Sequence, residues 1–286
     1  MKPPTSYFGG KTRMSAWLAG VLPPHQVYIE PFFGSGALFF AKARVRHEIV
    51  NDRNGHVANF YRVLRDQLHD LELALRLTPY ARDEFESADP AAPGLDPVER
   101  ARRWWVQINY SFNSVGARSG FSISTNQNTS ASRAALHRLD RFAPCHARLQ
   151  GVTIENRDAL ELITARDCPS ALHYIDPPYL DVTRTSWNDA DGYARRPGGD
   201  YEVEFAAEDD HRRLASTVAT CRGLVVVSGY SSPLYDELFD GWERCERPVM
   251  RYASNGRSTG PVPVTEVIWS NRPLATTPPL FVGAGT

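Results

Sequence analysis

Four β-rich runs of this chain each end on an acidic residue, and this repeated arrangement constrains the fold more than any other feature. The four acids are Glu30, Asp52, Asp158 and Asp176. Helical patterns follow the first three runs, at residues 37–42, 54–64 and 159–165. Alternating strands and helices predict a mostly parallel sheet, and the carboxyl ends of such strands share the edge where open α/β sheets bind ligands. We therefore expect a site lined by these acids.

The last of these acids opens the tetrapeptide Asp176-Pro177-Pro178-Tyr179, which follows the apolar run at residues 171–175. Two prolines fix the backbone φ and remove two N–H donors, so the chain must leave the sheet as a rigid turn. The turn combines a carboxylate, backbone carbonyls and an aromatic ring, and these groups suit a planar ligand that carries an NH2 group. A stiff turn in which Asp176 has no chemical role is the alternative interpretation.

A glycine turn follows the first run, in the segment Glu30-Pro31-Phe32-Phe33-Gly34-Ser35-Gly36. Glycines allow a tight turn and let a ligand approach the amides at the start of the next helix. Asp52 lies about 20 residues beyond this turn, the separation expected of an acid that accepts hydrogen bonds from a ribose diol. The segment Gly10-Lys11-Thr12 lacks both the earlier glycine and the preceding strand of a phosphate-binding loop, which argues against an NTPase.

Length and composition fit one large α/β domain, or a core domain with an insertion. The chain has 286 residues, of which 42% are apolar. No apolar run approaches the roughly 20 residues that span a bilayer, and the amino terminus lacks the apolar core of a signal peptide, so we expect a cytoplasmic protein without a membrane partner. The four cysteines are widely spaced and the eight histidines show no paired spacing. We therefore expect neither a disulfide framework nor a metal site.

A basic block lies in the middle of the chain. Residues 100–150 contain eight arginines and one acid, Asp140, although the whole chain has a net charge of −1. Such a block on a nearly neutral protein is typical of a surface that meets phosphates. Because the strand and helix alternation stops in the same region, arginines, aromatics and polar turns predict a nucleic-acid-binding insertion at residues 66–149. A solvated arginine face of a helix is the alternative.

Taken in order, the motifs resemble those of the Dam-type, or class alpha, S-adenosylmethionine-dependent N6-adenine DNA methyltransferases. The matching segments are Tyr7-Phe8-Gly9-Gly10-Lys11, residues 30–37, Asn51-Asp52-Arg53-Asn54, Asp158 and Asp176-Pro177-Pro178-Tyr179. The resemblance covers nearly all of residues 6–65 and 150–270. It is looser at Ala159, where many relatives have an aromatic residue, and at Ser119-Gly120-Phe121-Ser122, which only echoes the recognition pattern of the family.

The resemblance implies a Rossmann-like class I methyltransferase fold, with a seven-stranded sheet that ends in a β-hairpin. Residues 1–65 and 150–286 would form the cofactor-binding catalytic domain, and residues 66–149 a mostly helical target-recognition insertion. The implied reaction moves the sulfonium methyl group to the 6-amino nitrogen of an adenine that is flipped out of the duplex. The implied catalytic residues are Asp176, Pro177, Pro178 and Tyr179.

The resemblance also implies the binding residues. S-adenosylmethionine would be bound by Tyr7, Lys11, Glu30, Phe32, Gly34, Gly36, Asp52, Asp158 and Asp176. Double-stranded DNA would be bound by Arg102, Arg103, Asn113, Arg118 and Arg133. We expect a monomer of bacterial or phage origin, and the resemblance admits a cognate restriction endonuclease as a partner.

Other methyltransferase chemistries fit the residues less well. Methylation of cytosine carbon 5 needs a Pro-Cys nucleophile, whereas Cys168-Pro169 has the reverse order. Enzymes that methylate a cytosine amine usually present Ser at position 176, and those that methylate a protein glutamine present Asn. Two alternatives stay open: an amine methyltransferase of the same fold that acts on RNA adenine or cytosine, and a catalytically silent DNA-binding relative.

Overall fold

The computed structural model describes residues 1–6, 11, 14–111, 120–123, 130–178, 205, 207–252 and 261–274. At residues 250–252 and 261–263 the description is confined to the backbone. Within these ranges, every helix is too short or too polar to cross a bilayer.

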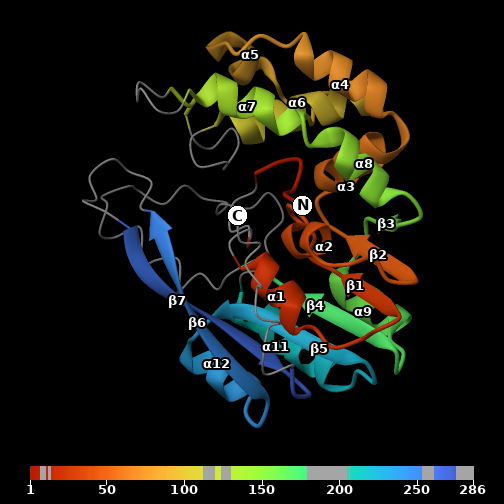
Figure 1. Ribbon diagram of the computed structural model, residues 1–286, viewed down its shortest axis with the longest axis vertical. Helices are drawn as coiled ribbons and strands as arrows, with labels where there is room; N and C mark the ends of the chain where they lie inside the picture. Colours follow the sequence, from red (N-terminus) through yellow and green to blue (C-terminus); the bar gives the residue numbers. More distant parts are fainter. Residues whose placement is uncertain are drawn as a thin grey trace, which may run out of the picture.

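A seven-stranded sheet forms the centre of the protein, in the order β3-β2-β1-β4-β5-β7-β6 (Figure 1). The strands are β1 Val27–Glu30, β2 His47–Asn51, β3 Thr153–Glu155, β4 Ala171–Ile175, β5 Leu224–Tyr230, β6 Glu243–Tyr252 and β7 Pro261–Ser270. The first five strands pair in parallel, whereas β7 pairs antiparallel with both β5 and β6. The expected seven-stranded sheet with a terminal hairpin is therefore confirmed.

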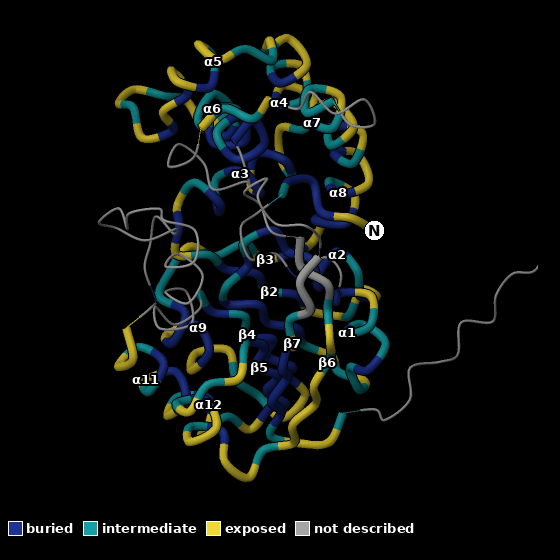
Figure 2. The backbone as a smooth tube through the Cα atoms, turned by 90° about the vertical axis from the view of Figure 1, so that its left-hand side faces the viewer, coloured by how far each residue is buried: buried dark blue, intermediate teal, exposed yellow. Residues whose placement is uncertain are grey.

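Helices cover both faces of the sheet, because successive residues of a strand point to opposite sides. Val226 of β5 belongs to a core that includes residues of α1 (Ser15–Val21), α2 (Ala37–Ala41) and α3 (Gly55–Asp66). Its neighbours Val225 and Val227 pack on the other side, with α9 (Ala159–Arg166), α11 (Glu208–Ala219) and α12 (Pro233–Leu238). Figure 2 shows that the central strands are mostly buried. Burial on both faces explains why this strand reads as a continuous apolar run.

The middle of the chain is helical, as expected. Its helices are α4 Leu68–Arg76, α5 Arg82–Ser87, α6 Pro97–Tyr110, α7 Ala131–Leu139 and α8 Phe142–Leu149. Figure 1 shows α4 to α7 together beyond one side of the sheet. The start of α6 follows from local chemistry, because the Asp96 side chain accepts the N–H groups of Val98 and Glu99. The assignment of residues 66–149 to a separate recognition domain stays a prediction.

These helices share an apolar core with the sheet. Trp104 of α6 packs on Phe60 of α3 with ring centroids 5.0 Å apart, and both rings are buried. A buried ion network adds a polar connection. The Oε1 atom of Glu48 in β2 accepts hydrogen bonds from Lys42 Nζ at 2.6 Å and from the guanidinium group of Arg148 in α8 at 2.7 Å. The last helix of the middle segment is therefore bonded directly to the sheet.

Candidate active site

The acids that close β1 and β4 lie at one edge of the sheet, because these two parallel strands are neighbours. The strand order also reverses here, since β2 follows β1 on one side and β4 lies on the other. Such a reversal leaves a crevice at the carboxyl ends of the strands, where open α/β sheets bind ligands. Glu30 is 2% exposed, whereas the side chain of Asp176 is 20% exposed. Of the two acids, Asp176 is therefore the one that a substrate can reach.

Two described side chains contact the Asp176 carboxylate, and a third supports one of them. The Ser228 hydroxyl of β5 donates a hydrogen bond to Oδ1 at 2.9 Å. Because that hydrogen is then in use, the buried Tyr174 hydroxyl, 3.0 Å away, donates to Ser228 Oγ. The Nζ atom of Lys11 lies 3.6 Å from the same oxygen. Among the described residues, the hydrogen bond to this carboxylate goes to Oδ1.

Lys11 links Asp176 to the last strand. Its ammonium group forms a short ion pair with Glu266 Oε2 of β7 and lies 5.5 Å from the centre of the Tyr230 ring. The Tyr230 hydroxyl donates to Glu266 Oε1 at 3.2 Å. Burial opposes the charge of Lys11, but Asp176 and Glu266 outweigh it and raise the pKa of the ammonium group above its ordinary value. Lys11 is therefore a permanent cation beside the carboxylate.

Asp176 is ionised near neutral pH although its environment resists the charge. Burial raises the pKa of Asp176 to about 6, against the positive charge of Lys11. The charge of Glu266 raises it further, and the hydrogen bond from Ser228 lowers it. The group is thus a carboxylate acceptor above pH 6 and a neutral acid well below it.

Glu30 supports the glycine turn from inside the protein. Its Oε2 atom accepts the Tyr28 hydroxyl at 2.7 Å. Burial raises the pKa of Glu30 to about 8, although the bonds from Tyr28 and from the Phe39 amide lower it. Phe39 lies in the first turn of α2, so Glu30 lies close to the start of the helix that follows the glycine turn. A contact between Glu30 and a cofactor stays a prediction.

Asp52 clamps the glycine turn from the neighbouring strand. Gly34 and Gly36 have left-handed φ angles of 47° and 65°, which glycine adopts without strain. The Gly34 N–H group donates to Asp52 Oδ2 at 2.8 Å, and the Asn54 N–H group donates to Oδ1 at 2.9 Å. The ends of β1 and β2 are therefore fixed to each other by a predicted site residue.

Asn51 and Asp158 connect this region to the third strand. The buried Asn51 amide donates to the carbonyls of Pro31 at 2.9 Å and Arg157 at 3.1 Å. Asp158 caps α9, accepting the N–H groups of Leu160 and Glu161. The expectation that the third strand extends to Asp158 is therefore wrong: β3 ends at Glu155, and a side chain that caps a helix must lie outside the strand.

Aromatic rings also meet at this edge. Phe32, which follows β1, packs on Phe205 in an edge-to-face arrangement with ring centroids 5.2 Å apart. Phe32 is half-buried. The predicted site residues Tyr7, Asn113, Arg118 and Tyr179 lie outside the described residues.

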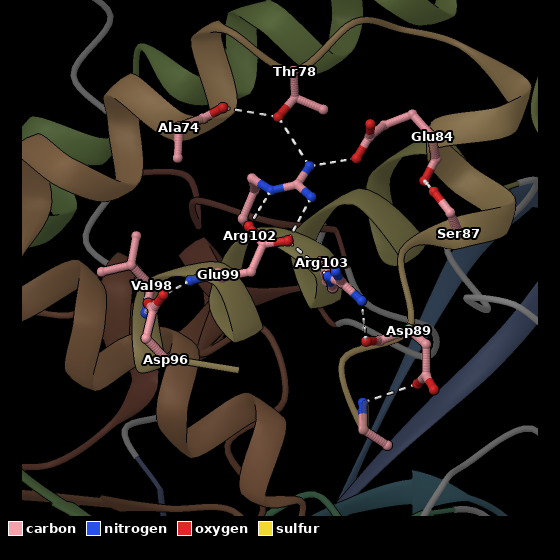
Figure 3. Close-up of polar contacts among 11 residues, drawn as sticks. Ala74, Thr78, Glu84, Ser87, Asp89, Asp96, Val98, Glu99, Arg102 and Arg103 are labelled. Atoms are coloured by element: carbon pink, nitrogen blue, oxygen red, sulfur yellow. Dashed lines mark hydrogen bonds and ion pairs between the residues drawn. The ribbon is translucent and has the colours of Figure 1, made fainter. Parts of the chain in front are cut away.

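The arginines expected to bind DNA differ in their surroundings. Arg102 of α6 is bonded to Glu99 at 2.6 Å, to Glu84 and to the Thr78 hydroxyl at 3.1 Å, and Arg103 is also bonded to Glu99 (Figure 3). The side chain of Arg102 is only 15% exposed. These two cations are neutralised within the protein by Glu84 and Glu99. Both acids precede residue 100 and so lie outside the basic block at residues 100–150. Arg133 of α7 is exposed.

One cluster of described residues has the chemistry of metal ligands, namely Asp167, His173 and Cys221. Asp167 accepts the N–H groups of Arg222 at 2.8 Å and Gly223 at 3.0 Å, and His173 Nε2 lies 3.1 Å from it. Burial and the charge of Asp167 raise the pKa of the Cys221 thiol to about 12, which disfavours a thiolate ligand. These bonds hold the turn before β5, at the opposite ends of the strands from Asp176, and we assign the cluster a structural role.

Sequence reasoning did not identify the supporting residues of the site, which are Asn51, Tyr174, Ser228, Tyr230 and Glu266. Two signals were present in the chain. Ser228 directly follows the apolar run at residues 224–227, and Glu266 lies within the mostly apolar stretch at residues 264–269. An acid inside a buried strand needs a hydrogen-bonding or charged partner, and this requirement indicates a polar site within the protein.

The chain is similar in sequence to known proteins over most of its length. The chain matches the sequence profile of the D12 class N6 adenine-specific DNA methyltransferases over residues 7–251. It is 25% identical over 287 residues to the type II methyltransferase M1.LlaDCHI of Lactococcus lactis subsp. cremoris, and the match covers 95% of each chain. It is also 25% identical over 229 residues to the DNA N-6-adenine-methyltransferase of Escherichia phage P1, covering 75% of this chain and 29% of that protein.

Among solved structures, a SAM-dependent O-methyltransferase of Thermotoga maritima is similar over 93% of this chain and 66% of its own, with 11% identity and a TM-score of 0.34.

Proposed function

Because the chain belongs to the D12 class N6 adenine-specific DNA methyltransferase family, we propose that its strand-end site holds the adenine 6-amino group for methylation. The enzyme transfers a methyl group from S-adenosylmethionine to that nitrogen in DNA. Of the two alternatives left open by the sequence, neither RNA methylation nor a silent DNA-binding role is favoured by the family. The roles of individual residues are the substance of this proposal.

The residues at the ends of β1 and β2 fit the adenosyl part of the cofactor. The left-handed turn at Gly34 and Gly36 gives close access to the backbone at the start of α2, and Asp52 is bonded to that turn at 2.8 Å. An acid in this place is suited to accept hydrogen bonds from ribose hydroxyls. The full proposed cofactor site comprises Tyr7, Lys11, Glu30, Phe32, Gly34, Gly36, Asp52, Asp158 and Asp176.

When bound, S-adenosylmethionine supplies the electrophilic methyl group. The adenine 6-amino nitrogen is a poor nucleophile, because its lone pair is delocalised into the ring. Asp176 Oδ2 and the Pro177 carbonyl accept the two N–H groups and so direct the lone pair out of the plane of the base. Tyr179 stacks on the base. Most of the rate gain in this proposal comes from orientation, and no covalent enzyme intermediate is required.

Ionised Asp176 is essential to this role. A carboxylate accepts N–H groups, whereas the protonated acid loses part of that capacity. Lys11 and Ser228 hold Oδ1, and this leaves Oδ2 for the substrate. This asymmetric binding of one carboxylate, at the edge where the strand order reverses, is the observation that carries the proposal.

DNA must reach the site with its target base out of the stack, because the 6-amino group is inaccessible in the duplex. Flipping the base costs a few kcal/mol, which contacts to the phosphates must offset. Arg133 is the exposed described arginine among those predicted to bind DNA. The middle segment, residues 66–149, is the proposed recognition domain, with Asn113 and Arg118 as further DNA contacts.

Two finer proposals concern partners. The related type II methyltransferase supports a restriction–modification setting with a cognate endonuclease. The second proposal is that the enzyme is a monomer, which a single peak of monomer mass in light scattering would support. The central experiment is expression in a host without DNA methylation, followed by modification-sensitive sequencing of its DNA. We expect N6-methyladenine at one sequence motif with the native chain and none with D176A. Absence of methyladenine with the native, folded chain would contradict the proposed function.

A further inference from the structure

We propose that Glu266 of β7 is a positioning residue for methyl transfer: it holds the Lys11 ammonium group, so that Lys11 steadies Asp176 without occupying it. The proposal rests on the function proposed above and deepens it. No motif in the sequence assigns a role to Glu266, which lies about 90 residues beyond Asp176 on the strand that pairs antiparallel with β5.

The position of Glu266 follows from strand register. In the antiparallel pair of β5 and β7, Glu266 lies opposite Tyr230 and Ile268 lies opposite Ser228. Ser228 and Tyr230 are two residues apart, so their side chains project from the same face of the sheet. Glu266 therefore projects from the face on which Ser228 reaches Asp176. A slip of one residue would remove it from the site.

Lys11 is shared unequally between two carboxylates. Its Nζ atom is in short contact with Glu266 Oε2 but 3.6 Å from Asp176 Oδ1. Both Lys11 and Glu266 are buried, at 5% and 6% exposure. Of the two acids, Glu266 thus takes the closer bond, and Asp176 receives a longer contact. In the absence of the Glu266 charge, Asp176 would be the remaining carboxylate of this pair and would draw the ammonium group toward itself.

This arrangement reconciles two requirements of the reaction. Asp176 needs a nearby cation, because burial disfavours its charge. It must also accept an N–H group from the substrate, and a tight ion pair with lysine would compete for that place. The second acid satisfies both requirements, because it binds the cation and leaves the Asp176 carboxylate accessible.

The charges that face Asp176 have opposite effects on its ionisation. The positive charge of Lys11 lowers the pKa of Asp176, and the negative charge of Glu266 raises it. Among the described residues, the titratable groups that interact with Asp176 are Lys11, Glu266, Glu30, Tyr174 and Tyr235. Replacement of Glu266 by glutamine should therefore shift the acid limb of the pH–rate profile to lower pH, and replacement of Lys11 by methionine should shift it to higher pH.

The test compares the full-length native enzyme with E266Q, E266D and K11M. A matched control is E246Q. It removes the charge of an exposed glutamate on the adjacent strand β6, where Glu246 pairs with Arg244. For E266Q we expect the acid limb of kcat to move down by about one pH unit and kcat on the alkaline plateau to fall about tenfold, with KM for DNA nearly unchanged. E266D should recover part of kcat, because it restores the charge with a shorter reach.

A second readout does not depend on activity. Carbon-13 NMR of the Asp176 carboxyl group, assigned by comparison with D176N, follows its ionisation in the cofactor-free protein. We expect the midpoint to fall in E266Q and to stay at its native value in E246Q. An unchanged midpoint together with an unchanged acid limb, in an E266Q protein of native melting temperature, would overturn the proposal.

The failure of this proposal is distinguishable from failure of the proposed function. If the native chain methylates no DNA, the function fails, and the NMR titration still decides whether Glu266 controls Asp176. If E266Q does not fold, E266D carries the comparison, since it keeps the charge but lengthens the contact with Lys11. An E266D enzyme with the native acid limb and native kcat would then contradict the positioning role.

Discussion

The Ser228 hydroxyl donates a 2.9 Å hydrogen bond to Asp176 Oδ1, from one strand to the end of its neighbour. This contact fixes one oxygen of the proposed catalytic carboxylate through a side chain that is itself fully buried. The orientation of Asp176 is therefore set by the sheet, and the turn that follows it need not supply that orientation.

Removal of the Asp176 carboxylate should separate binding from chemistry. In D176A we expect methyl transfer to fall 10²-fold or more, because an essential acceptor for the amine is lost. Affinities for S-adenosylmethionine and DNA should stay within about tenfold of native values. Single-turnover rates together with calorimetric binding check this. Full activity in D176A would contradict the proposed mechanism.

Loss of the Ser228 hydroxyl should act through pH. The hydrogen bond from Ser228 lowers the pKa of Asp176, so S228A should raise that pKa above about 6. The acid limb of kcat should move up by about one pH unit, with a loss of roughly fivefold at pH 6 and a smaller loss at pH 8.5. Y174F keeps the Ser228 hydroxyl and should therefore shift the acid limb less than S228A. An equal loss at every pH would mean that Ser228 only orients Asp176.

Glu30 should make stability depend on pH. Its pKa is about 8 in the folded protein against an ordinary value of 4.5, so between these values the folded state holds a proton that the unfolded state has lost. The free energy of unfolding therefore falls as pH rises from about 4.5 to 8, by up to about 1.4 kcal/mol for each pH unit. E30Q lacks this dependence and should gain in melting temperature relative to the native protein from pH 5 to pH 8. If the melting temperatures of E30Q and of the native protein changed in parallel with pH, Glu30 would be ionised in the folded state.

Two glycines with similar backbone angles provide a matched pair. Gly36 has φ 65° and Gly94 has φ 77°, but a Cβ atom at Gly36 would lie 2.5 Å from Phe33 Cζ, whereas none of the described atoms lies within 4 Å at Gly94. G94A should cost about 1–2 kcal/mol in free energy of unfolding. G36A should cost about 1–3 kcal/mol more and should weaken cofactor binding. Urea titration and calorimetry measure both. Equal effects would mean that Phe33 moves aside without cost.

Two arginines should respond differently to the same substitution. R133Q removes an exposed charge, so DNA affinity should fall several-fold and the slope of log affinity against log salt concentration should become shallower by about one, at native melting temperature. R102Q leaves Glu84 without its cation and Glu99 with Arg103 alone, so the melting temperature should fall. A native melting temperature with weak DNA binding in R102Q would restore its predicted role.

The central strands were predictable because a strand that is buried on both faces needs a continuous run of apolar residues. The predicted run at residues 171–175 coincides with β4. The third strand is shorter than expected because Asp158 bonds to the start of α9. An acid that caps a helix and an acid that ends a strand follow the same apolar pattern, and only the backbone distinguishes them.

The site was only half predictable, for a physical reason. The acids at the strand ends could be found, since each follows its own strand along the chain. The partners of Asp176 and Lys11 could not, because Ser228 and Glu266 reach them through strand order and antiparallel register. The ion pairs of the basic block could not be predicted for the same reason, because Arg102 pairs with Glu84, which lies on a different helix.

The buried bond between Arg148 and Glu48 limits how specificity modules can be exchanged between relatives. If residues 66–149 of this protein were replaced by the matching segment of a homologue, Arg148 would be removed and its partner Glu48 would remain. A donor without a cation at this place would leave a buried glutamate with Lys42 alone. Chimeras that keep α8 with the recipient and exchange only α4 to α7 preserve this joint, and they are the combinations that should fold.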